Sequence, residues 1–260
     1  MAEDRSEVLE GWADYWNERA ETYSVQNLSE LDTNKRLLWR KLILDHAPDR
    51  PRLRVLDVGT GPGFFAINLA LAGHAVTAVD VTEQMIAHAK ENAAQRGAAV
   101  DFRVQRGEVL PFADGSFDLV VNRNVLWNLE YPEQALQEWK RVLSPGGRMV
   151  LFDGNWYLYL FTEEEAARRR AMKFECPPEA SEADRRSLEI IQARIREAEE
   201  LARRLPLSRE RRPAWDVQAL ERLGMRIVDV IEDVSPLVYD ETDLLRDRTS
   251  PMFLVCAEKE

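Results

Sequence analysis

Cysteine is scarce in this chain. Cys176 and Cys256 are the only two among 260 residues, and they are far apart. A disulfide framework and a metal site of the C-x-x-C type are therefore not expected, and we predict no bound metal. The apolar run around Cys256 indicates a core position for that residue.

Long apolar segments are absent too, since no run approaches the roughly 20 residues of a transmembrane helix. Residues 1–7 are acidic and lack the apolar centre of a signal peptide. Together with the low cysteine content, these features predict a cytoplasmic protein.

Basic residues are outnumbered, because 35 lysines and arginines face 46 acidic residues and leave a formal net charge of −11. Nucleic acids and anionic membranes attract basic surfaces, so neither is an expected partner. Hydrophobic residues make up 45% of the chain, which is enough for a sizeable core. Nothing in the sequence indicates an oligomeric state.

From about residue 53 onward, short apolar runs alternate with helical patterns. Repeated units of this kind predict an α/β fold, a Rossmann-like doubly wound sheet that is mostly parallel. The elements expected are strands at 54–58, 75–80, 99–104, 117–122, 148–153, 225–232 and 251–258 and helices at 63–72, 82–96, 132–143 and 214–223. Residues 144–147 are expected to cap the third of these helices.

The pattern divides the chain into three parts. Residues 1–46 read as an N-terminal helical cap with many aromatic side chains. Residues 47–154 and 214–260 form the expected core, and residues 155–213 a charged helical insert. Because the insert leaves the sheet after a strand, at the edge where ligands bind, we expect it to act as a lid.

A glycine-rich turn follows the first strand of the core, with Gly59, Gly61 and Gly63 in alternate positions. Glycine permits a positive φ and lets a ligand approach the backbone closely. Asp80 follows the next strand, about twenty residues on, where a carboxylate can hold the hydroxyls of a ribose. The spacing differs from the G-x-G-x-x-G of dinucleotide-binding proteins, which disfavours a dehydrogenase. A nucleoside-containing cofactor is the prediction.

The segment Asp57-Val-Gly-Thr-Gly-Pro-Gly63 resembles motif I of the class I S-adenosylmethionine-dependent methyltransferases. The runs 79–85, 110–121 and 139–147 resemble further motifs of the ubiquinone/menaquinone-biosynthesis type, which acts on small molecules. This resemblance implies S-adenosylmethionine as cofactor and a seven-stranded sheet whose last strand is antiparallel. The cofactor-binding residues that it and the sheet geometry suggest are Asp57, Gly59, Thr60, Gly61, Gly63, Asp80, Val81, Met85, Glu108, Val109 and Asn122.

One position departs from the family pattern. Arg106 stands where these proteins usually have an aspartate that bonds the adenine amino group, and Glu108 or a backbone carbonyl is the expected substitute. The departure also favours an alternative function, a regulatory protein that binds the nucleoside without transferring a methyl group.

The methyl acceptor is expected to be a small molecule that contacts aromatic and amide side chains. Those residues are Trp16, Tyr23, Asn124, Trp127, Trp156 and Tyr157. Asp153, Tyr157 and Tyr23 are the candidates for a catalytic proton acceptor, whereas His46, His74 and His88 are expected to be structural. Since methyl transfer mainly needs aligned reactants in a dry site, we expect positioning to dominate over acid–base chemistry.

Overall fold

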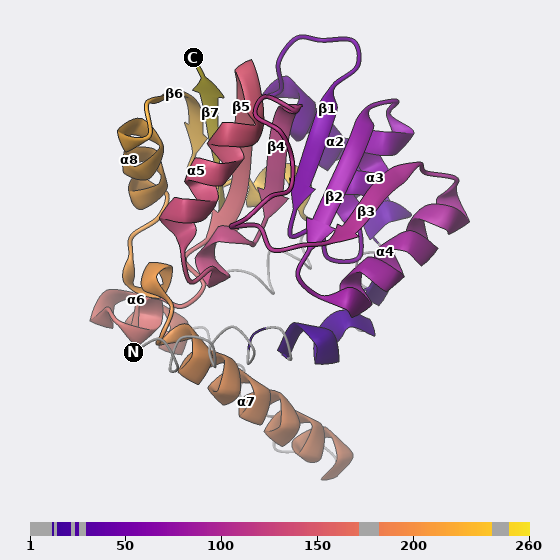
Figure 1. Cartoon of the computed structure of the whole chain (residues 1–260). Coiled ribbons are helices and arrows are strands. Elements are labelled where there is room, and N and C mark those ends of the chain that lie inside the picture. The colour runs from indigo at the N-terminus through magenta and orange to yellow at the C-terminus, as the bar shows by residue number, and fades with distance from the viewer. Residues whose placement is uncertain (1–11, 13–14, 22–23, 26–29, 172–181, 241–249) are drawn as a thin grey trace.

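The computed structural model describes residues 12, 15–21, 24–25, 30–171, 182–240 and 250–260, with the backbone alone for 182–191. Seven strands form one sheet in the order β3-β2-β1-β4-β5-β7-β6 (Figure 1). Strand β7 runs antiparallel to both of its neighbours, and β1 to β5 pair in parallel. The strands are β1 Arg54–Val58, β2 Ala75–Asp80, β3 Val100–Val104, β4 Phe117–Arg123, β5 Leu143–Gly154, β6 Met225–Ile231 and β7 Met252–Lys259. The predicted fold class is confirmed.

Helices cover both faces of this sheet (Figure 1). They are α2 Lys35–Asp45, α3 Phe64–Leu71, α4 Glu83–Arg96, α5 Pro132–Val142, α6 Glu163–Ala171, α7 Glu182–Ala202, α8 Ala214–Arg222 and α9 Ser235–Val238. Short 3₁₀ turns lie at η1 Leu126–Asn128, η2 Leu158–Leu160 and η3 Pro206–Arg209. No helix in the described part of the chain is both long and apolar enough to span a bilayer.

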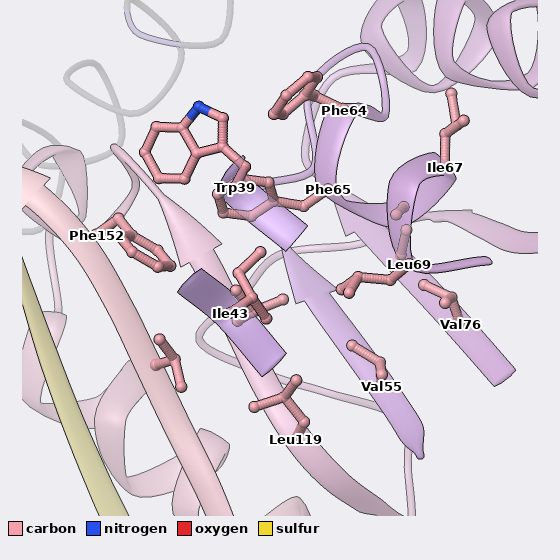
Figure 2. Close-up of a cluster of buried hydrophobic side chains, with 14 of the residues drawn as sticks. Trp39, Ile43, Val55, Phe64, Phe65, Ile67, Leu69, Val76, Leu119 and Phe152 are labelled. Atoms are coloured by element: carbon pink, nitrogen blue, oxygen red, sulfur yellow. The ribbon is translucent and has the colours of Figure 1, made fainter. Parts of the chain in front are cut away.

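Alternate residues of each strand point to opposite faces, and this divides the core into two clusters. Val55 packs with Trp39 and Ile43 of α2 on one face, as Figure 2 shows. The next residue, Leu56, packs with Trp139 of α5 on the other face. The apolar runs of these strands reflect burial on both sides.

Strand β1 lies between β2 and β4, so the chain reverses its direction of travel across the sheet beside β1. In doubly wound sheets, a crevice opens at this switch point beyond the carboxyl ends of the strands. The loops after β1, β2 and β4 all emerge there.

The prediction for residues 144–147 is wrong. They begin β5 instead of capping α5, because Leu143 already adopts an extended backbone and pairs with Phe117. The register between β4 and β5 shifts after that pair, and Gly146 takes a φ of +70° within the irregularity. Pro145 also disfavours helical backbone at the residue before it.

The insert lies beyond one end of the sheet, with α7 as its longest helix (Figure 1). Ala198 and Ala202 of α7 and the following Leu205 pack with Trp12 and Trp127 in a third apolar cluster. The N-terminal segment and the insert therefore meet over the same edge of the fold. The three-part division of the chain stays a prediction.

Candidate functional site

A cavity of about 760 Å³ opens at the carboxyl ends of β1, β2 and β4. Its volume falls in the range of small-molecule and cofactor sites. The core contributes loops to one side of this cavity, and the N-terminal segment, α6 and α7 contribute side chains to the other. Among the predicted site residues, its lining contains Gly59, Gly61, Asp80, Val81, Met85, Glu108, Trp16, Asn124, Trp127, Trp156 and Tyr157.

The loop after β1 brings backbone to the cavity wall. Gly59 and Gly61 adopt φ angles of +64° and +54°, which side-chain-bearing residues rarely take. A Cβ atom added to Gly59 would lie only 2.4 Å from the side chain of Val125. The loop is therefore a close-fitting cradle.

Asp80 ties this loop to the end of β2. Its Oδ2 accepts a hydrogen bond from the Gly61 N–H at 2.9 Å, and its Oδ1 accepts from the N–H and hydroxyl of Thr82 at 3.0 and 2.7 Å. The same carboxylate lines the cavity. Burial raises the pKa of Asp80, whereas these donors lower it.

Asp57 lies behind the loop instead of in the cavity lining. The side chain is 2% exposed and accepts hydrogen bonds from the Thr60 hydroxyl at 2.6 Å and the Ala66 N–H at 3.0 Å. Burial raises its pKa to about 7. Thr60 and Gly63, likewise absent from the lining, belong to the same turn, where Gly63 is the N-cap of α3. These residues support the loop and do not themselves face the cavity.

The loop after β3 carries the departure from the family pattern. Arg106 and Glu108 both line the cavity, and they pair at 3.3 Å. Glu108 is 5% exposed, while Val109 is 57% exposed and is not part of the lining. The position of Glu108 in the lining is thus consistent with its predicted role as substitute for the aspartate that the family usually has. Val109, by contrast, lies outside the cavity.

The end of β4 presents two asparagines in different ways. Asn122 is completely buried and absent from the lining, and neither its Nδ2 nor its Oδ1 has a hydrogen-bond partner among the described residues. Asn124 lines the cavity with a φ of +60°, and its carbonyl accepts the indole N–H of Trp127 at 3.0 Å.

Aromatic rings form one wall of the cavity, called the aromatic wall below. Trp127 lies 5.2 Å from both Trp12 and Tyr157, measured between ring centroids, and Trp12 stacks with Trp16 at 6.4 Å. Trp156 also lines the cavity. Tyr23, predicted to contact the donor and acceptor, lies outside the described residues.

Asp153 does not suit the role of proton acceptor. Its carboxylate is completely buried and pairs with Arg212 at 2.6 Å. It also accepts hydrogen bonds from the Trp127 N–H at 3.1 Å and the Trp156 indole at 3.0 Å. A carboxylate so fully engaged holds two walls of the cavity in place. Tyr157 is a poor proton acceptor in another way, because burial raises its pKa above its usual range.

The histidines lie away from the cavity lining. His46 contacts the Leu42 carbonyl at 2.8 Å and Asp229 at 3.0 Å, and His74 accepts the Leu53 N–H at 3.3 Å. His88 lies 3.9 Å from Glu91 on α4. Such contacts agree with structural roles.

Sequence reasoning missed several lining residues. They are Glu30, Tyr159, Arg169, Arg194 and Tyr239. Residues 163–212 carry mixed charge that reads as a solvated helix face, so Arg169 and Arg194 gave no signal. Tyr159 alone had a sequence signal, because it stands two positions after the predicted site residue Tyr157. Both tyrosines line the cavity.

Part of this chain is similar in sequence to known proteins. The family description "Methyltransferase domain" matches residues 56–151. A malonyl-[acyl-carrier protein] O-methyltransferase of Erwinia pyrifoliae is 43% identical over 109 residues, covering 42% of this chain and 40% of that protein. A demethylmenaquinone methyltransferase of Thermus thermophilus is 38% identical over 119 residues, covering 45% and 54% respectively. The chain thus spans about half the length of these curated relatives.

Solved structures are similar to this chain in their fold. An S-adenosylmethionine-dependent methyltransferase from Aquifex aeolicus matches with a TM-score of 0.54 at 21% identity, covering 90% of this chain and 98% of that one. The segment that matches the family description, residues 56–151, contains the glycine loop and most of the parallel strands β1 to β5. Residues 56–151 therefore match a methyltransferase domain, and the chain shares the fold of a solved S-adenosylmethionine-dependent methyltransferase.

Proposed function

We propose that this protein transfers a methyl group from S-adenosylmethionine to a small-molecule acceptor inside the cavity described above. The observation that carries the proposal is the make-up of the cavity lining. A glycine cradle and the carboxylates of Asp80 and Glu108 line the same cavity as an aromatic wall. The name of one curated relative supports a small acceptor, since it is a demethylmenaquinone methyltransferase.

The cradle fits the cofactor. Gly59 and Gly61 bring bare backbone to the cavity, and Asp80 presents a carboxylate in the lining that a ribose hydroxyl would contact. Val81 and Met85 supply apolar surface for the adenine ring, and the buried carboxylate of Glu108 would take over the contact that Arg106 cannot make. The cofactor brings an electrophilic methyl group on a cationic sulfur. Aromatic rings such as Trp127 stabilise a nearby cation by about 0.5–2 kcal/mol.

The protein's contribution to the reaction is positioning. Aromatic side chains exclude water and fix the acceptor, and neither Asp153 nor Tyr157 is suited to removing a proton. Asp153 is paired with Arg212, and Tyr157 holds its proton at neutral pH. Aligning two reactants is itself a large source of rate enhancement. The acceptor is expected to enter with its nucleophilic atom already available.

Calorimetry with S-adenosylmethionine and S-adenosylhomocysteine tests the proposal. We expect both to bind, Gly61→Val to abolish binding, and Asp80→Ala to weaken it by about tenfold or more, since the lost partner is charged. Asp101→Ala is the matched control, because Asp101 is an exposed carboxylate of β3 that is paired with Arg103 and lies outside the cavity. Undetectable binding of both compounds to the unmodified protein would refute the proposal.

A further inference from the structure

The cavity carries more positive than negative side chains, although the chain as a whole has a net charge of −11. Basic groups that gather in one hollow of an acidic protein indicate a ligand of opposite charge. Among the described residues, five arginines and three carboxylates line the cavity: Arg19, Arg106, Arg123, Arg169, Arg194, Glu30, Asp80 and Glu108.

The three carboxylates are already engaged on the core side of the cavity. Glu30 pairs with Arg123 at 3.0 Å, and Glu108 pairs with Arg106 at 3.3 Å. Asp80 accepts hydrogen bonds from the backbone of its own loops. The acids of the lining therefore neutralise two of the five arginines, and the other three have no acidic partner in the lining.

Those three, Arg19, Arg169 and Arg194, form no ion pair with any residue in the described part of the chain. Arg19 lies over the ring of Tyr15 at 5.4 Å and donates to its hydroxyl at 2.7 Å. Arg169 lies over the ring of Tyr159 at 3.8 Å. The nearby acid Glu199 accepts the Tyr159 hydroxyl at 2.7 Å and pairs with no arginine among the described residues. The guanidinium groups of Arg19 and Arg169 thus rest on aromatic faces without an acidic partner in that part of the chain.

Arg19 and Arg169 come from segments about 150 positions apart in sequence, yet both act on one ring. Burial raises the pKa of Tyr157, and the charges of both Arg19 and Arg169 oppose that rise. Tyr157 in turn packs against Trp127. The two cations therefore lie near the same aromatic wall, each over a tyrosine ring of the cavity lining.

Trp12 adds a donor to the same wall. Its side chain is 4% exposed and lines the cavity, and its indole N–H is buried without an acceptor among the described residues. A buried donor left unpaired costs about 1–3 kcal/mol. An oxygen atom of a bound ligand would remove that cost.

We propose that the methyl acceptor is an aromatic carboxylic acid, with its ring against Trp127 and Tyr157 and its carboxylate between Arg19 and Arg169. A guanidinium group matches the geometry of a carboxylate with two parallel hydrogen bonds. The flat aromatic wall supplies the apolar contact that the body of such an acid requires. The inference rests on the proposed function, because it names the substrate class of the same cavity.

Two probes with one ring system test the charge preference: 2-naphthoate and the uncharged 2-naphthamide. Their dissociation constants are measured by calorimetry on the full chain saturated with S-adenosylhomocysteine, so that only the acceptor side is open. We expect 2-naphthoate to bind about tenfold tighter or better, as for hydrogen bonds to a charged group. Arg19→Gln and Arg169→Gln should each reduce this preference, and Arg19→Lys should retain part of it.

Arg209→Gln is the matched control. Arg209 also lies over an aromatic ring, that of Phe161 at 5.1 Å, but outside the cavity lining, so its loss should not alter the preference. Equal affinity for the two probes, no binding of either, or an unchanged preference in both cavity variants would overturn the inference. If S-adenosylhomocysteine itself does not bind, the proposed function fails, and the probes without cofactor still report on the arginines.

Discussion

Arg212 and Asp153 form an ion pair at 2.6 Å in which the two side chains are 1% and 0% exposed. Arg212 also pairs with Asp216 of α8, and although burial lowers the pKa of the guanidinium, the two carboxylates raise it. Asp153 in turn accepts hydrogen bonds from Trp127 and Trp156. The end of the insert is thereby joined through one buried charge network to the aromatic wall of the cavity.

Removal of Arg212 should be among the most destabilising single changes in this protein. Arg212→Met leaves two carboxylates buried without their cation, which typically costs about 3–5 kcal/mol of the free energy of unfolding. Urea unfolding measures this cost. Arg222→Met is the control, because that exposed arginine pairs with the exposed Glu133 and should contribute about 0–1 kcal/mol. Equal losses in the two variants would show that the buried network adds little.

Gly59 and Val125 should be energetically coupled. An added Cβ at Gly59 would lie 2.4 Å from a methyl group of Val125, and the φ of +64° disfavours any side chain. We expect Gly59→Ala to cost about 2–4 kcal/mol through overpacking and backbone strain. Val125→Ala should relieve the contact, so the double variant should lose less than the sum of the single variants, with a coupling of about 1 kcal/mol. Strict additivity in a double-mutant cycle would contradict the close approach.

Asp57 should make stability depend on pH near neutrality. Burial raises its pKa from 3.8 to about 7, so between these values the folded chain holds this proton more tightly than the unfolded chain does. The free energy of unfolding should therefore fall as the pH rises toward 7, by up to about 4 kcal/mol from this residue. Asp57→Asn cannot ionise and still offers an acceptor to Thr60. Unfolding curves from pH 5 to 8 should show a weaker decline for the variant, and parallel curves would rule the effect out.

Cys256 should resist thiol reagents in the folded protein. Its side chain is completely buried in β7, and burial raises the pKa of the thiol to about 12. Cys176 lies outside the described residues, so the measurement uses a Cys176→Ser variant. The rate of reaction with a chromogenic disulfide should be near zero in buffer and rapid in denaturant. Fast labelling of the native variant would place Cys256 nearer to solvent than the structure does.

The local sequence pattern was sufficient to predict most elements of the core. The alternation of Val55 and Leu56 between two apolar clusters follows from the period of a strand, and the turn glycines stand where φ is positive. The beginning of β5 escaped prediction, because the pairing of Leu143 with Phe117 is a contact between distant residues that no local signal reveals.

Prediction of the cavity was less complete for the same reason. Gly61 and Asp80 were within reach because both follow strands of one parallel sheet, whose carboxyl ends meet. Asp153 looked available in the sequence because its partner Arg212 lies 59 residues away. Arg169 looked like a solvated charge, and only packing of the insert over the sheet brings it to the cavity.

The sequence by itself determined the Rossmann-like sheet, the glycine loop and the carboxylate after β2, because periodicity, turn chemistry and the order of elements along the chain can be read locally. Tertiary structure decided which charges are neutralised and which face the cavity. That decision depends on burial and on partners that are distant in sequence, so Asp153 became a structural anchor while Arg19 and Arg169 kept their charge for a ligand.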